Sequence, residues 1–141
     1  MNQTPERSAT YEFTFDPTNK IIGIIDDPAA AKIAVRDLRA AGFAADEIEV
    51  VMGKKGAERV DLTGEGHEAS IHVVNTEKPP AFYDAPVIIK KVEEEMLAGH
   101  YLIGVSAKEQ EARERALDIL KSHDGHFINF YGRWAAESWE P

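Results

Sequence analysis

The chain contains the same strand–helix–strand pattern twice, and this repeat limits the possible folds more than any other feature. The two copies read IIGIIDDPAAAKIAVRDLRAAGF and LIGVSAKEQEARERALDILKSHDGHF. When Gly23 is aligned with Gly104, each lies inside an apolar run, and each copy then reaches a glycine, Gly42 or Gly125, before a second apolar run. A period of about eighty residues is too long for a solenoid. The repeat therefore predicts two βαβ units.

Local signals in both copies support a helix between the strands. In the first copy Asp27 can cap the helix, Pro28 suits its first turn and Gly42 suits a left-handed stop. In the second copy Ser106 is the expected cap. Apolar residues recur at helical spacing in both segments. They are Ala31, Ala34, Val35 and Leu38 in the first helix, and Ala112, Ala116, Ile119 and Leu120 in the second.

The four expected strands are of two kinds. Ile21–Ile25 and Tyr101–Val105 are apolar without alternation, as in strands that are covered on both faces. Residues 47–53 and 126–132 carry polar residues between apolar ones, which favours edge strands. We therefore predict an α+β, ferredoxin-like βαβ-βαβ sandwich. Its sheet is four-stranded and antiparallel in the order 4-1-3-2, with both helices on one face.

The second face of this sheet needs a cover, and the sequence offers three. One is an extra helix over residues 86–98, with Ile89, Val92 and Met96 on one stripe and Gly99 as its stop. Another is a strand in the segment YEFTF, whose Tyr11, Phe13 and Phe15 share a face. The third is a second subunit, which predicts a homodimer through the open sheet face. In domain terms we expect a flexible arm at 1–19, one α/β domain at 20–134 with a long insertion at 54–98, and a tail at 135–141.

Composition removes several classes of function. The sequence has no cysteine, which excludes disulfides, thiolate chemistry and sulfur-ligated zinc. A net charge of −9 repels phosphate backbones and anionic lipids, so we expect neither nucleic acid nor membrane as a partner. No apolar run approaches the roughly 20 residues of a membrane span, and the N-terminal residues lack a signal-peptide layout. These features predict a cytoplasmic protein.

The stretch ERVDLTGEGHEASIH, in the insertion, concentrates polar and ionisable residues. His67 and His72 are five residues apart, which directs them away from each other on a helix and to opposite faces of a strand. A loop could still gather Asp61, Glu65 and His67 around a hard ion, but we assign no metal ligand and no cofactor. The preceding GKKG, with Arg59, offers cations and backbone N–H groups for a small anion, or is a glycine-rich turn whose lysines face water.

Several motifs resemble small bacterial proteins related to the general stress or heat-induced stress protein domain. They are GAERVDLTGEGH, AGHYLIGVSA and GHFINFYGRW, and the resemblance extends from about Lys20 to Trp134. It implies an α/β sandwich and an association with stress response, and it implies no particular reaction. The segment EASIHVVNTEKPPAFYD departs from the family, because an apolar helical stretch is expected there and this chain carries two consecutive prolines. The matching positions are Gly56, Arg59, Asp61, Gly64, His67, Gly99, His100, Tyr101, Gly125, His126, Asn129, Tyr131, Gly132, Arg133 and Trp134.

The resemblance draws attention to polar residues that could meet if the insertion folds back over the sheet. We expect a ligand-binding group that consists of Arg59, Asp61, His67, His100, His126 and Arg133. The alternative is a purely structural role, in which an Arg–Asp pair holds a loop in place and the histidines donate hydrogen bonds to backbone carbonyls. The predicted function is a dimeric, non-enzymatic, stress-associated domain that binds a ligand or partner. The alternative is an enzyme for a small anionic or carbonyl substrate, with His67 or His100 as general base and Arg59 as anion clamp. A purely structural or assembly role is the third possibility.

Overall fold

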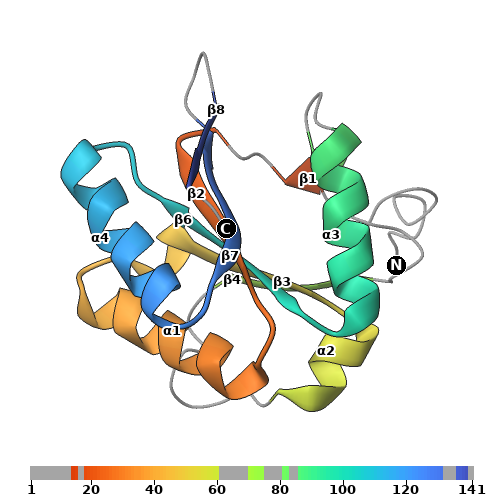
Figure 1. The fold of residues 1–141 in the computed structure, drawn as a ribbon. Coiled ribbons are helices and arrows are strands. Elements are labelled where there is room, and N and C mark those ends of the chain that lie inside the picture. The colour runs from red at the N-terminus through yellow and green to blue at the C-terminus, as the bar shows by residue number, and fades with distance from the viewer. Residues whose placement is uncertain are drawn as a thin grey trace, which may run out of the picture.

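A six-stranded sheet runs through the middle of the molecule in the order β4-β3-β6-β2-β7-β8 (Figure 1). Neighbouring strands are antiparallel except β3 and β4, which are parallel. The strands span β2 Lys20–Ile25, β3 Ile48–Gly53, β4 Ser70–Val74, β6 Tyr101–Ser106, β7 His126–Tyr131 and β8 Ala136–Trp139. This computed structural model describes residues 14–15, 18–60, 70–74, 81–82, 86–131 and 136–139.

The two repeated units supply the four central strands of the sheet. These lie in the order β7-β2-β6-β3, which reads 4-1-3-2 from one edge and 2-3-1-4 from the other when the four are numbered along the chain. β3 and β7 were expected at the edges, and this expectation was wrong, because β4 and β8 pair with their outer sides. The segments expected to be an insertion and a tail thus each add a strand to the sheet.

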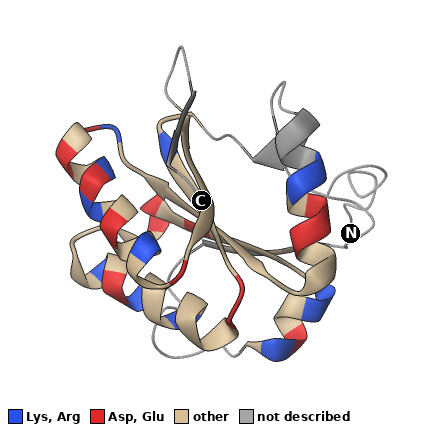
Figure 2. Ribbon diagram, viewed as in Figure 1, with Lys and Arg blue, Asp and Glu red and all other residues tan. Residues whose placement is uncertain are grey.

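Helices α1 (Pro28–Ala40) and α4 (Gln110–Ser122) cover one face of the sheet (Figure 1). α1 begins as predicted, since the Asp27 carboxylate accepts a hydrogen bond of 2.9 Å from the Ala30 N–H. Gly42 follows with a φ of +107°, which confirms the left-handed stop. Charged residues recur along both helices (Figure 2), and none of them is buried.

The start of α4 differs from the prediction. Ser106 does not cap it, because Ser106 is still paired with Lys20 as the last residue of β6. The N-cap residue is Glu109, and its side chain makes no capping bond. At the other end the left-handed residue is Asp124, with a φ of +63°, rather than the glycine that follows.

Among the described side chains, the layer between the sheet and the α1–α4 pair holds the larger apolar core. Both stripes predicted from helical spacing enter it: Ala116 and Leu120 of α4 are fully buried, and Ala112 and Ile119 pack against them. The buried members of this core are Ile21, Ile25, Ala31, Ala34, Val35, Leu38, Phe43, Ile48, Val50, Met52, Tyr101, Ile103, Val105, Ala107, Ala116, Leu120, Ile128 and Phe130.

The other face of the sheet carries α3, which spans Pro86–Ala98 as expected for the extra helix (Figure 1). Val92 and Met96 are completely buried, and Gly99 follows the helix with a φ of +87°. Among the described side chains, the buried members of this second apolar core are Ile22, Ile24, Val51, Val92, Met96 and Leu102. A helix from the insertion therefore covers part of the face for which the sequence left three alternatives open.

The described part of the segment YEFTF lies outside the main sheet. Its last two residues form β1 (Thr14–Phe15), which pairs in parallel with β5 (Ala81–Phe82) in a separate two-stranded sheet. Tyr11 and Phe13 lie outside the described residues. The arm expected at residues 1–19 thus includes a short strand.

The insertion begins with a helix, although the motif GKKG is typical of a glycine-rich turn. A 3-10 turn (Ala45–Glu47) precedes β3, and α2 (Lys54–Arg59) follows β3 directly. Gly56 is buried in α2, and the Tyr101 hydroxyl donates a hydrogen bond of 2.8 Å to its carbonyl oxygen. A Cβ at Gly56 would lie 3.2 Å from the Tyr101 ring, so the glycine permits this close approach. Among the described helices none has the length and apolarity to cross a membrane.

Candidate metal centre

Three central strands bring ionisable residues to the same end of the sheet. Asp26 follows the last residue of β2, His100 precedes the first residue of β6, and His126 opens β7. β2 is antiparallel to both neighbours, so its C-terminal end lies beside their N-terminal ends. In the register, Ile25 pairs with Tyr101 and Ile24 pairs with His126.

Side-chain alternation places these residues on the α3 face. Ile22 and Ile24 of β2 contact the α3 core, so Asp26, two residues further on, continues the same face. His100 stands in the same relation to the buried Leu102. From the opposite side α3 contributes Glu95, which neighbours the inward-facing Met96 and lies three residues after Val92.

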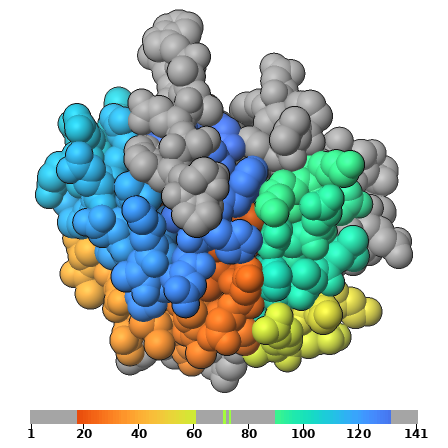
Figure 3. All heavy atoms as spheres, viewed as in Figure 1, coloured from red at the N-terminus to blue at the C-terminus, as the bar shows by residue number. Residues whose placement is uncertain are grey.

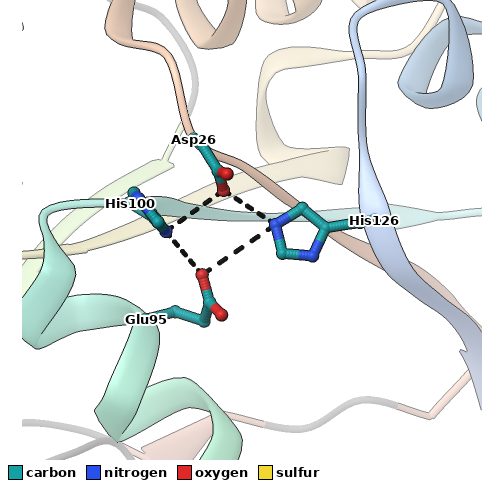
Figure 4. A group of neighbouring side chains, drawn as sticks. All are labelled: Asp26, Glu95, His100 and His126. Carbon is teal, nitrogen blue, oxygen red and sulfur yellow. Dashed lines mark hydrogen bonds and ion pairs between the residues drawn. The ribbon is translucent and has the colours of Figure 1, made fainter. Parts of the chain in front are cut away.

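The four side chains converge on one point, as Figure 4 shows. His100 Nδ1 lies 2.6 Å from Glu95 Oε1 and 3.1 Å from Asp26 Oδ1. His126 Nε2 lies 2.7 Å from Asp26 Oδ1 and 3.9 Å from Glu95 Oε1. The four donor atoms all lie within 4.8 Å of one another.

Exposure varies around the cluster. The Glu95 side chain is 11% exposed, against 55% for Asp26, and the two histidines lie between these values. Solvent therefore reaches the cluster from the Asp26 side. In the space-filling view the end of β2, the start of β7 and the α3–β6 segment meet at the molecular surface (Figure 3).

Glu95 is the most buried member, and its two carboxylate oxygens have His100 and Lys91 as partners. Its Oε2 atom lies 3.1 Å from the Lys91 ammonium, one turn earlier on α3. Burial raises the pKa of the Glu95 carboxyl, but the hydrogen bonds with His100 and Lys91 outweigh it, so this pKa lies below its usual value of 4.5. Glu95 is therefore a carboxylate at neutral pH, with Oε1 directed at the histidines.

This donor set fits a divalent transition-metal ion. Imidazole nitrogen and carboxylate oxygen bind zinc at about 2.0–2.2 Å, which gives a tetrahedron with edges of about 3.3–3.6 Å. The four nitrogen–oxygen separations given above, 2.6–3.9 Å, lie on either side of that edge length. Two carboxylates would neutralise the charge of the ion, and small shifts of four side chains would complete the geometry. His100 would bind through Nδ1 and His126 through Nε2.

The structure brings together two of the six residues that the sequence singled out. These are His100 and His126. Arg59 lies nearby, and its Nη1 donates a hydrogen bond of 2.8 Å to the carbonyl of Gly99, which precedes His100. Arg59 also lines a cavity of about 230 Å³ together with Pro28, Ala29, Lys32 and Val60. Asp61, His67 and Arg133 lie outside the described residues.

Sequence reasoning missed Asp26 and Glu95 and assigned no metal ligand. Asp26 stands next to the helix cap Asp27 and reads as part of the same turn. Glu95 ends the run EEE, and a run of charged residues is typical of a solvated helix face. Both could have been found from periodicity. Asp26 is two residues from Ile24 on the strand, and Glu95 is three from Val92 on the helix.

Comparison of the chain with models of known protein families, with curated proteins and with solved structures gives no match.

Proposed function

We propose that this protein binds a divalent transition-metal ion of the zinc class through Asp26, Glu95, His100 and His126. The observation that carries the proposal is the convergence of four donor atoms from three strand ends and one helix within 4.8 Å. Nitrogen and oxygen donors with no thiolate suit Zn²⁺, Co²⁺, Mn²⁺ or Fe²⁺ better than Cu⁺.

The architecture supports this proposal because each ligand comes from a rigid element. A ligand held by a strand end or a packed helix loses little conformational freedom when the ion binds. Lys91 adds to this, since its ion pair holds Glu95 Oε2 while Oε1 is directed at His100 and would act as a single-oxygen ligand. The ion would join α3 to the three strand ends.

Calorimetric titration of the chelator-treated protein with ZnCl₂ tests the proposal. We expect one site per chain, with at least a hundredfold loss of affinity in Glu95→Gln, which keeps the side-chain shape and removes the charge. With Co²⁺, a tetrahedral nitrogen–oxygen site gives a visible spectrum stronger than that of six-coordinate aqueous cobalt. Saturable one-to-one binding lost in Glu95→Gln supports the proposal.

Lys108→Gln provides a matched control, because it also removes one charge on an exposed residue outside the cluster. Its affinity should equal that of the unaltered chain. If Zn²⁺ and Co²⁺ bind with equal strength to the unaltered protein and to Glu95→Gln, the four groups form a hydrogen-bonded cluster alone and the proposal is wrong.

The wider role proposed from the motifs is that of a ferredoxin-like, stress-associated binding domain without catalytic activity. The order of the four central strands and the positions of α1 and α4 support the ferredoxin-like assignment. The convergence of Asp26, Glu95, His100 and His126 supports ligand binding. A homodimer that uses the second sheet face would have to form around α3, which covers part of that face; light scattering of the purified protein tests the dimer.

A second candidate function, binding of a small anion, is favoured by the cavity that Lys32 and Arg59 line. Two cations beside a pocket of this size suit a phosphate or carboxylate group. In the enzymatic form of this hypothesis His100 would act as the general base and Arg59 as the anion clamp. Inorganic phosphate should then raise the unfolding temperature of the unaltered protein and have no effect on a Lys32→Ala, Arg59→Ala double variant.

A further inference from the structure

The pairing of β2 with β7 contains an irregularity next to one of the proposed ligands. Asn129 pairs with Ile22, but His126 pairs with Ile24, so three residue steps on β7 match two on β2. One extra residue is therefore inserted in β7, which defines a β-bulge. Phe127, immediately after His126, has a φ of +52°. Such a conformation is costly for a bulky side chain.

The bulge decides which face of the sheet His126 occupies. In an uninterrupted register, Ile24 would pair with Phe127 and Ile25 would pair with His126. Ile25 belongs to the α1–α4 core, whereas Ile24 belongs to the α3 core. Directly paired residues of antiparallel strands point to the same face. A regular strand would therefore direct His126 toward α1 and α4, away from Glu95 and His100.

Two contacts hold the bulge in place. The Asn129 amide, in a side chain only 8% exposed, donates a hydrogen bond of 3.1 Å to the carbonyl oxygen of Phe127. The Phe127 ring packs on the α3 core and lies 5.6 Å from the Lys91 ammonium, which also pairs with Glu95. Lys91 thus links the strained residue after one proposed ligand to the carboxylate of another.

We infer that Phe127 and Asn129 are positioning residues, which maintain a β-bulge that turns His126 onto the α3 face as a metal ligand. This inference rests on the proposed metal function and deepens it. It explains why a bulky residue occupies a left-handed conformation here: the strain places both His126 and Phe127 on the same face.

Two substitutions at one position test the role of the backbone. Phe127→Asn and Phe127→Val both remove the ring and introduce side chains of similar size, but only asparagine tolerates positive φ well. Because Phe127→Asn loses the contact of the ring with the α3 core but tolerates the positive φ, we expect it to bind Zn²⁺ a few-fold more weakly than the unaltered protein. Phe127→Val should weaken binding by roughly 10- to 100-fold, as is typical when the support of a ligand is lost. Equal affinities in the two variants would overturn the inference.

A double-mutant cycle shows whether Asn129 acts through His126. Asn129→Leu should weaken Zn²⁺ binding in the unaltered protein and have no further effect in a His126→Ala background. If Asn129→Leu lowers the unfolding temperature and leaves Zn²⁺ affinity unchanged, or weakens binding equally in both backgrounds, Asn129 has a structural role only and the inference fails.

An NMR measurement on the metal-free protein separates this inference from the proposed function. Nuclear Overhauser contacts between the His126 and His100 rings should be present in the unaltered protein and in Phe127→Asn, and lost in Phe127→Val. If these contacts behave so but no Zn²⁺ binds, the metal proposal fails while the bulge is shown to orient His126. If the contacts persist in Phe127→Val, the bulge does not depend on residue 127 and the inference is wrong.

Discussion

Replacement of His126 by alanine should abolish most of the stabilisation that zinc gives to the protein. An ion present at 100 times its dissociation constant stabilises a folded protein by about 2.7 kcal/mol. For a domain of this size each kcal/mol raises the unfolding temperature by about 3–5 °C, so we expect a rise of about 8–13 °C. If His126→Ala weakens binding a hundredfold, the same zinc concentration gives only about 0.4 kcal/mol, or about 1–2 °C.

His123→Ala is the control for this experiment. His123 Nε2 lies 2.8 Å from Asp37 Oδ2, which closely matches the 2.7 Å pair of His126 and Asp26, but it joins α4 to α1 and is not one of the four converging residues. Both aspartates are substantially exposed, so the loss of either pair should cost only about 0.5–1 kcal/mol in the metal-free protein. The two variants should therefore have similar unfolding temperatures without zinc and differ strongly with it.

The assay is thermal unfolding followed by circular dichroism, in EDTA and in excess ZnCl₂, for the unaltered protein and both variants. Since His123→Ala should keep the full zinc-dependent rise, this comparison separates loss of a ligand from general destabilisation. A zinc-dependent rise in His126→Ala as large as that in His123→Ala would refute the assignment of His126 as a ligand.

Three other predictions follow from the described contacts. In Gly23→Ala the new methyl group would lie 3.2 Å from Cγ1 of the buried Ile128. Urea unfolding should therefore show that the free energy of unfolding falls by about 1 kcal/mol or more. An unchanged free energy of unfolding would contradict this packing. Arg59→Met should cost about 0.5–1.5 kcal/mol in the same assay, through the hydrogen bond to the Gly99 carbonyl, without a change in zinc affinity. Burial raises the pKa of Tyr131 to about 12, so an absorbance titration should show a phenol that ionises above the usual 10 and is absent in Tyr131→Phe. Because the unfolded chain loses this proton first, Tyr131 should make the protein less stable as pH rises from about 10 to 12, and a titration complete by pH 11 would contradict this.

The repeat predicted the central part of the fold because both copies carry strong local signals. The cap at Asp27, the stop at Gly42 and the apolar stripes depend on residues that are close in sequence, and the structure confirms them. β4 and β8 were not predicted as members of the sheet. Edge strands are covered less fully than central ones, so their sequences lack a strong apolar pattern. Ser106 resembled a cap, but sheet pairing with Lys20 prevailed over local preference.

The candidate metal centre was predictable in part. Alternation along β2 and β6 and helical spacing along α3 could have placed Asp26, His100 and Glu95 on a common face. His126 could not have been added in this way, because a regular strand places it on the opposite face. Its position depends on a one-residue bulge, which is set by tertiary packing and by the Asn129 side chain.

In the described part of the chain, the α3 layer buries fewer apolar residues than the α1–α4 layer, and this difference affects local opening. Among side chains that the structure describes, the α1–α4 layer buries eighteen residues and the α3 layer buries six. Segments with less buried apolar surface open more readily, so the amides of α3 should exchange with solvent before those of α1 and α4. An ion bound between Glu95 and the strand ends would slow amide exchange in α3 most, because it would link this helix directly to the sheet.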